Sequence, residues 1–149
     1  MLDDFLIHVF HKGNTLEAYK VFGAHLETND HKKGVRFTVY APNARSVQVV
    51  GDFNDWDGQN HYMERYTDGG IWTLFIPGVK EFALYKYRIE TQNFATVDRA
   101  DPYAFYSELR PGTASRVYNI ERFRWADKKW LNSRTKNFDK PMNIYEVNI

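Results

Sequence analysis

The spacing of apolar residues changes near Gly23, and this change separates two kinds of predicted structure. Before it, apolar side chains recur every three or four positions, which is the period of one helix face. Asp3 is placed to cap the start of this helix, and Gly13 is placed to end it. Asn14 and Glu17 have the spacing of a capping box for a second short helix, which Gly23 would close. Neither helix is long enough to be stable alone, so each must pack on another element.

From Gly34 onward apolar and polar residues alternate, which is the period of a strand with one buried face. Val35, Phe37 and Val39 are the clearest example, and turn residues separate this run from those that follow. The predicted strands span residues 34–42, 46–53, 71–76 and 83–90, with weaker candidates at 96–99 and 116–121. Short strands separated by turns, with no helix between them, predict an all-β fold, an immunoglobulin-like antiparallel β-sandwich of about seven strands.

The pattern changes again after Ile120. Residues 124–136 are predicted to form a short, polar and basic helix, and a connector follows it. Pro141 then introduces the strand-like sequence MNIYEVNI, inside which the chain stops. A strand that lacks both a turn and a partner leaves a bare edge, which finished proteins avoid. We therefore expect the natural polypeptide to continue beyond this segment.

Composition narrows the class of protein. The 149 residues suffice for one well-buried core, and the aromatic share of 17% is high. Twenty basic residues nearly balance nineteen acidic ones, so the basic excess typical of a nucleic-acid binder is absent. The sequence contains no cysteine, which rules out disulfides and thiol catalysis. No apolar run approaches the length of a membrane span, and the acidic start is unlike a signal peptide. We predict a cytoplasmic protein that binds neither nucleic acid nor membrane.

The acidic loop after the second predicted strand invites a metal-binding interpretation. With Gly58 at the sixth position of a calcium loop, Asp55, Asp57 and Glu64 fall on ligand positions. The first position is then Phe53, which has no oxygen ligand to offer, and the flanking sequence indicates strand and turn where a calcium loop needs helices. The five histidines are scattered and do not supply three ligands in one place. We predict no metal site and no cofactor.

Catalysis is not supported by the same loop. Hydrolysis or transfer of sugars needs two opposed carboxylates, one of them tuned as an acid. Asp52, Asp55 and Asp57 lie on one polar turn, where water keeps all three ionised. Their expected role is to cap backbone N–H groups in the turn. We find no phosphate-binding glycine loop and no Ser-His-Asp grouping, and we predict no catalytic residue.

With metal and catalytic sites excluded, a binding surface is the remaining possibility, and the tryptophans are the first candidates for it. Trp72 alternates in step with its apolar neighbours and is predicted to lie in the core. Trp125 and Trp130 belong to the basic connector and could dock it onto a neighbour. Trp56 stands in a polar turn with no apolar face to join, which leaves two interpretations. The ring either folds back over the edge of the sandwich or is a platform on which a sugar ring stacks.

A lysine on a predicted strand is a second candidate for such a surface. Lys86 lies on the face opposite Tyr85 and Tyr87, and its ammonium group offers three hydrogen-bond donors. Taken alone, a solvated surface lysine is the simpler interpretation.

Several motifs in order along the chain support the binding interpretation. They are VRFTVYAPNARSVQVVGDFNDWDG, GGIWTLFIPGV, ALYKYRI, ADPYAF, ELRPGTAS and PMNIYEVNI. In this order, and above all through the pairing of RPGTAS with PMNIYEV, nearly the whole chain resembles the amino-terminal part of bacterial 1,4-α-glucan (glycogen) branching enzymes. The resemblance implies that residues 24–119 form a starch-binding-type β-sandwich of carbohydrate-binding module family 48, preceded by a helical extension at 1–23. It also implies that residues 120–149 hold a connector and the first strand of a catalytic (β/α)8 barrel.

The resemblance also suggests binding residues. In related modules two tryptophans and a lysine form the sugar platform; the first tryptophan corresponds to Trp56 in FNDW and the lysine to Lys86 in YKY. The second tryptophan has no counterpart, and Phe94 is the nearest ring. A phenyl ring covers less area than an indole and stacks more weakly. With Asn54 as a polar group beside Trp56, the predicted glucan-binding residues are Trp56, Lys86, Phe94 and Asn54.

Three hypotheses for function follow from the resemblance. The first is a non-catalytic module that binds α-1,4-glucan beside the catalytic barrel of the same polypeptide, whose catalytic carboxylates would lie beyond Ile149. The second is a structural domain that supports and orients that barrel without binding glucan. The third assigns the module to a debranching enzyme or a trehalohydrolase, against which RPGTAS and PMNIYEV argue.

Overall fold

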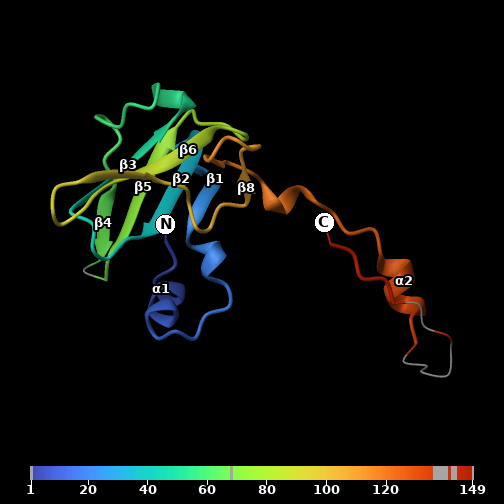
Figure 1. Cartoon of the computed structure of the whole chain (residues 1–149). Coiled ribbons are helices and arrows are strands. Elements are labelled where there is room, and N and C mark those ends of the chain that lie inside the picture. Colours follow the sequence, from blue (N-terminus) through green and yellow to red (C-terminus); the bar gives the residue numbers. More distant parts are fainter. Residues whose placement is uncertain (1, 68, 136–140, 142–143, 149) are drawn as a thin grey trace.

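Two antiparallel β-sheets pack face to face in the computed structural model (Figure 1), which describes residues 2–67, 69–135, 141 and 144–148. The first sheet has the order β1-β2-β5-β4: β1 (Gly23–Asn29), β2 (Lys32–Tyr40), β5 (Ile71–Pro77) and β4 (Glu64–Thr67). The second has the order β3-β6-β9-β8, and β7 also pairs with β6: β3 (Ser46–Gly51), β6 (Leu84–Glu90), β9 (Ser115–Arg116), β8 (Tyr106–Ser107) and β7 (Thr96–Arg99). The predicted all-β sandwich is confirmed, with nine strands in the described residues where about seven were expected.

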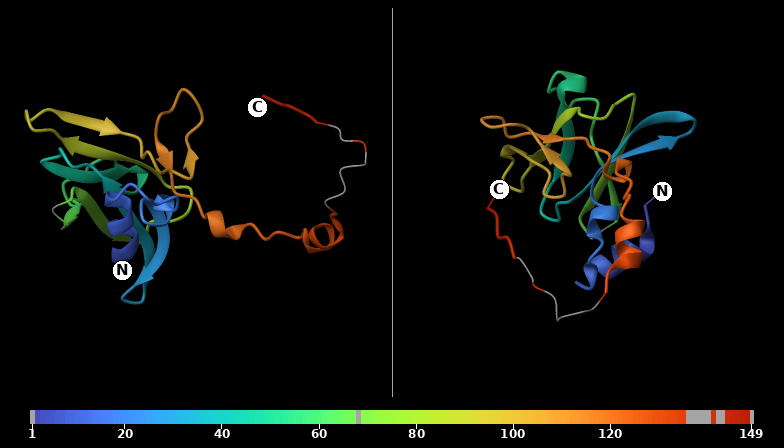
Figure 2. Two further views of the ribbon diagram at one scale, coloured as in Figure 1. Left: turned by 90° about the horizontal axis from the view of Figure 1, so that it is seen from below. Right: turned by 90° about the vertical axis from the view of Figure 1, so that its right-hand side faces the viewer.

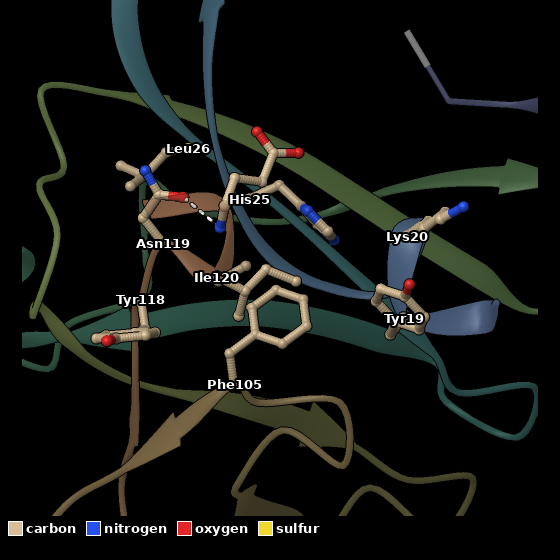
Figure 3. A pocket seen from close by; sticks show the side chains of 10 residues that line it. Tyr19, Lys20, His25, Leu26, Phe105, Tyr118, Asn119 and Ile120 are labelled. Carbon is tan, nitrogen blue, oxygen red and sulfur yellow. Dashed lines mark hydrogen bonds between the residues drawn. The ribbon is translucent and has the colours of Figure 1, made fainter. Parts of the chain in front are cut away.

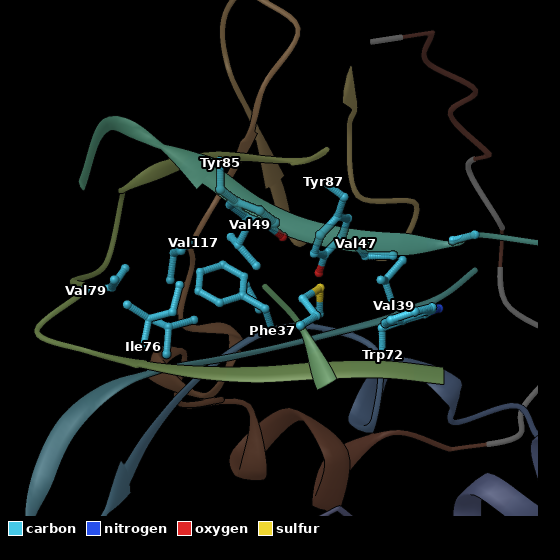
Figure 4. Close-up of a cluster of buried hydrophobic side chains, with 14 residues drawn as sticks. Phe37, Val39, Val47, Val49, Trp72, Ile76, Val79, Tyr85, Tyr87 and Val117 are labelled. Carbon is cyan, nitrogen blue, oxygen red and sulfur yellow. The ribbon is translucent and has the colours of Figure 1, made fainter. Parts of the chain in front are cut away.

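The core lies between the two sheets, as strand alternation predicts (Figure 4). Val35 and Phe37 on β2 are fully buried, and the Tyr85 ring on β6 meets the Phe37 ring from the opposite sheet, with the ring centroids 5.0 Å apart. Trp72 is only 6% exposed, and its indole N–H donates to the Ala41 carbonyl at 3.0 Å. The prediction that Trp72 is a core residue is confirmed. Each fully buried apolar side chain of this kind stabilises the fold by roughly 1.5–3 kcal/mol.

The first predicted helix is present as α1 (Asp4–His11). The Asp3 carboxylate accepts hydrogen bonds from the Phe5 and Leu6 N–H groups, and Gly13 follows the helix with φ +71°. The helix packs on a second buried cluster: Leu2, Ile7, Val21, Phe22 and Ile71. The apolar face of α1 is therefore covered by the edge of the sandwich, as its short length requires.

The second predicted helix is wrong in extent. Only a 3₁₀ turn, η1 (Ala18–Lys20), forms, and the capping box between Asn14 and Glu17 is replaced by a hydrogen bond from the Glu17 N–H to the Thr15 hydroxyl. Gly23 opens β1 instead of closing a helix. Its φ of +102° and the Tyr103 carbonyl, 2.9 Å from where a Cβ would lie, explain the need for glycine.

Three strands were not predicted because their sequences do not alternate clearly. β1 lies at an edge and only its first two residues are buried, β4 carries a bulge, and β8 is two residues long. Conversely, the candidate strand at 116–121 shrinks to β9 and the 3₁₀ turn η3 (Ile120–Arg122).

Beyond the sandwich, the chain runs outward from η3 (Figure 1, and the left view of Figure 2). The predicted helix at 124–136 is present as the shorter α2 (Lys128–Ser133). Of the strand-like segment MNIYEVNI, residues 144–148 have no regular structure and the remaining three lie outside the described residues. Its assignment as the first strand of a barrel stays a prediction. No helix in the described ranges is long and apolar enough to cross a membrane.

Candidate functional site

The loop after β3 is held by the side chain of Asn54. Its oxygen accepts a hydrogen bond from the Gly51 N–H at 2.8 Å, and its Nδ2 donates to the Val49 carbonyl at 3.0 Å. The same nitrogen lies 3.0 Å from Nδ1 of His61. Asn54 is thus hydrogen-bonded inside the loop, and its contact with glucan stays a prediction.

Trp56 has a backbone conformation that bulky residues rarely adopt. Asp55 and Trp56 are both left-handed, with φ of +52° and +60°. Each such residue costs on the order of 1–3 kcal/mol and persists only where surrounding contacts impose it. The Trp56 N–H donates to the Gly51 carbonyl at 2.9 Å, and Nη1 of Arg88 donates to the Trp56 carbonyl at 3.2 Å. Hydrogen bonds at both the N–H and the carbonyl of Trp56 therefore hold the strained loop in place.

The loop folds back over the outer face of the second sheet. Val50 points to this face, opposite Lys86, yet it is fully buried because the loop covers it. Gly58 lies so close that a Cβ there would be 2.9 Å from Cβ of Gln48 and 3.0 Å from Cγ1 of Val50. This packing holds Trp56 above the sheet with 37% of its surface exposed. Its ring is partly packed but is not sealed beneath its neighbours.

Two basic side chains of β6 share that outer face. Nζ of Lys86 donates to the Thr113 hydroxyl at 2.7 Å. The guanidinium of Arg88 donates two hydrogen bonds to the Asp98 carboxylate, at 2.8 and 2.9 Å. These hydrogen bonds lower the pKa of Asp98, so this carboxylate stays ionised. The pair fixes Arg88, which in turn fixes the Trp56 carbonyl.

A shallow groove of about 270 Å³ continues along this face. It is lined by Ser46, Gln48, Tyr62, Arg88, Glu90 and Thr96. Phe94 lies on the turn beyond it, at φ +63° and 67% exposed, with the Arg45 guanidinium 4.0 Å from its ring centroid. In the described part of the chain no ring contact joins Phe94 to Trp56. The two rings are therefore separate, one on the loop after β3 and the other on the turn between β6 and β7.

The acidic residues of the loop serve its structure. The Asp52 carboxylate accepts from the Leu84 N–H at 3.1 Å, and the Asp57 carboxylate accepts from the Gln59 N–H at 3.0 Å. The predicted capping of an N–H group in the turn is confirmed for Asp57, whereas Asp52 instead ties the loop to the first residue of β6. Within the described ranges, no group of three or more His, Asp or Glu side chains is arranged to hold a metal ion.

A larger cavity, of about 470 Å³, lies elsewhere, between β1, η1 and η3 (Figure 3). Tyr19, His25, Phe105, Tyr118 and Ile120 contribute to its walls. Burial lowers the pKa of His25, so this imidazole is neutral at pH 7. The cavity brings together none of the predicted site residues.

Several residues that shape the site were not predicted from the sequence. Arg88 follows Lys86 by two positions, so the strand period alone places both side chains on one face. Asp98, Thr113 and Arg45 reach the site only through strand pairing and loop packing, which no local pattern reveals.

A β-sandwich that presents exposed rings and fixed hydrogen-bonding groups on one sheet face has the architecture of a carbohydrate-binding module. The family described as Carbohydrate-binding module 48 (Isoamylase N-terminal domain) matches residues 21–104, and the chain belongs to this family.

Relatives and solved structures agree with this assignment. The chain is 46% identical over 145 residues to the 1,4-alpha-glucan branching enzyme GlgB of Bacillus subtilis (strain 168), covering 96% of this chain and 23% of that enzyme. It is 47% identical over 140 residues to the corresponding enzyme of Bacillus cereus (strain AH820). Among solved structures, the maltotriose complex of PulA from Klebsiella pneumoniae superimposes with a TM-score of 0.54 at 27% identity, covering 70% of this chain and 12% of that one. The chain thus spans less than a quarter of the length of these curated relatives.

Proposed function

We propose that this chain is a non-catalytic module that binds α-1,4-glucan on the outer face of the second sheet. The observation that carries the proposal is Trp56, a bulky ring held on a strained backbone where it stays partly exposed. Backbone strain of this kind clusters at binding and active sites, where the surrounding contacts impose it. Lys86 adds a hydrogen-bond donor on the same face, and Phe94 adds a second exposed ring on the turn between β6 and β7.

The chemistry of this face suits a neutral polysaccharide. The indole packs against the apolar C–H face of a sugar ring, while ammonium, amide and hydroxyl groups bond to its hydroxyls. We place the module in a branching enzyme that transfers α-1,4-glucan chains to 6-hydroxyl groups, as the names of the relatives suggest. A weak second contact with the polymer raises its concentration near the catalytic barrel of the same cytoplasmic polypeptide.

A second function, support of that barrel, is favoured by a different observation. The connector carries exposed Phe123, Trp125 and Trp130, at 69%, 75% and 61% exposure. Apolar rings at this density on a polar segment are expected to be covered by a neighbour. The two functions are compatible, since they use different parts of the chain.

Titration of the chain with maltoheptaose, followed by calorimetry, tests glucan binding. We expect dissociation constants between about 1 μM and 1 mM, which is weak binding, and we expect Trp56→Ala to abolish it. Trp125→Ala is the matched control, because it removes an exposed indole from the connector and should leave binding unchanged. A flat titration of the folded wild-type chain at saturating sugar would refute the proposal.

A further inference from the structure

The outer face that carries Lys86 continues across two more strands. Leu84 on β6 pairs with Arg116 on β9, and Arg116 pairs with Tyr106 on β8. The adjacent pair, Tyr85 and Ser115, is buried in the core. Because side chains alternate along a strand, Arg116 and Tyr106 project from the same outer face as Lys86.

Three aromatic rings gather at this end of the face. The rings of Tyr106 and Tyr118 are stacked, with centroids 5.4 Å apart and planes 25° apart. Phe82 meets Tyr118 edge-on at 5.9 Å. Phe82 and Tyr106 are each 46% exposed. We call Phe82, Tyr106 and Tyr118 the aromatic patch; it is partly exposed to solvent and lies next to a basic residue.

That basic residue, Arg116, has unmatched donors. Its guanidinium carbon lies 5.8 Å from the Tyr106 ring centroid, and its buried Nε has no hydrogen-bond partner. Within the described ranges it makes no hydrogen bond or ion pair, whereas Lys86 is bonded to Thr113 and Arg88 to Asp98. A buried donor without a protein partner is unusual in folded proteins, and a water molecule or a bound ligand then supplies its acceptor.

We propose that Arg116 and the aromatic patch form a second contact region for a long α-1,4-glucan that also crosses Trp56. This inference rests on the proposed function and extends it to chain length. Rings that stack on sugar faces, beside donors that need oxygen acceptors, match a hydroxyl-rich neutral polymer.

The spacing of the two regions sets the ligand length. Trp56 is fixed by Arg88 above β3, and Tyr106 lies three strands away at the level of Leu84. With strands about 4.8 Å apart and a rise of about 3.4 Å per residue, the two regions are on the order of 20 Å apart. One ligand that contacts both must therefore be longer than a trisaccharide.

The test compares maltotriose with maltoheptaose on two variants. Arg116→Met removes the donors but keeps an apolar stem, and Tyr106→Ser removes one ring of the patch. Each should weaken maltoheptaose binding about three- to tenfold, in line with the net contribution of one hydrogen bond or one stacked ring. Neither should change maltotriose binding at Trp56. Arg124→Met, on the connector, is the matched control for removal of an arginine.

A measurement on the unmodified protein covers the case in which a variant fails to fold. In an isotope-labelled chain, the Nε–Hε resonance of Arg116 should shift on addition of maltoheptaose and stay in place with maltotriose. An unmoved resonance, or wild-type maltoheptaose affinity in both variants, would overturn the second region while leaving Trp56 binding intact. A shift caused by inorganic phosphate and not by sugar would overturn it in favour of an anion site. Absence of all sugar binding by the wild-type chain would instead defeat the proposed function itself.

Discussion

The two faces of strand β6 differ in where their side chains find partners. On the inner face, the Tyr85 and Tyr87 hydroxyls donate to the Asp101 carboxylate at 2.7 and 3.0 Å, inside the core. On the outer face, Lys86 and Arg88 bond to surface groups and to the Trp56 loop. One face holds the sandwich together, and the other positions groups toward solvent. Alternate residues of a single strand thus separate packing of the core from the surface proposed to bind glucan.

The largest expected effect comes from removing an inner ring. Tyr87→Ala should lower the free energy of unfolding by about 3–5 kcal/mol, because it leaves a cavity and removes a donor to a buried carboxylate. Lys86→Ala, one residue away on the other face, should cost less than about 1 kcal/mol while weakening glucan binding. Urea denaturation and sugar titration of both variants measure the contrast. Equal loss of stability in Tyr87→Ala and Lys86→Ala would show that the two faces contribute equally to the stability of the fold.

Substitutions at Trp56 sharpen the same comparison. Trp56→Gly should be more stable than Trp56→Ala by about 1–2 kcal/mol, because only glycine adopts the left-handed backbone without a Cβ clash. Both variants should lose sugar binding to the same extent, since neither has a ring. Thermal and urea unfolding of the pair provides the measurement, and equal stability would mean that the loop relaxes when the indole is removed.

The contributions of Asp101 and Asp98 to stability should depend on pH in opposite ways. Burial raises the pKa of Asp101 on the inner side, so the folded chain holds this proton more tightly than the unfolded chain. Its contribution to stability therefore falls as pH rises from the ordinary aspartate pKa, about 3.9, through the raised pKa. Asp101→Asn should remove this fall, seen as a difference between urea midpoints measured across that range.

Asp98 on the outer face should behave in the opposite way. Its hydrogen bond with Arg88 lowers its pKa, so its contribution is present above the ordinary aspartate pKa and is lost as pH falls through the lowered value. Because the pair is partly exposed, Asp98→Asn should change stability only slightly. If Asp101→Asn kept the wild-type pH profile of stability, the buried Asp101 carboxylate would not be the cause of the fall in stability with rising pH.

The smallest expected effect concerns Phe94. Replacing it by tryptophan should raise maltoheptaose affinity about two- to fivefold, since an indole offers a larger stacking surface. The side chain is 67% exposed, so stability should be unchanged. Calorimetric titration against wild type is the measurement; reduced affinity would place Phe94 outside the path of the ligand.

Much of the fold follows from local pattern, and part of the site does not. The alternation in β2 and β6 predicts both the strands and the opposite faces of Tyr85 and Lys86. β1 was not predicted because it is an edge strand with a mostly polar sequence. Its pairing with β2, and not its intrinsic strand propensity, orders it. Asn54 looks like an exposed polar group in sequence, yet backbone partners in its own loop occupy its side chain.

The left-handed pair at Asp55 and Trp56 has a consequence for engineering. Most of the hydrogen bonds that hold this loop lie between Val49 and His61, and strand β6 adds two more, from the Arg88 guanidinium to the Trp56 carbonyl and from the Leu84 N–H to the Asp52 carboxylate. The loop should therefore keep its backbone conformation, and the position of its indole, when it is transplanted onto another two-layer β scaffold that has an arginine on the adjoining strand. The aromatic residue at position 56 could then be varied while the loop backbone stays the same.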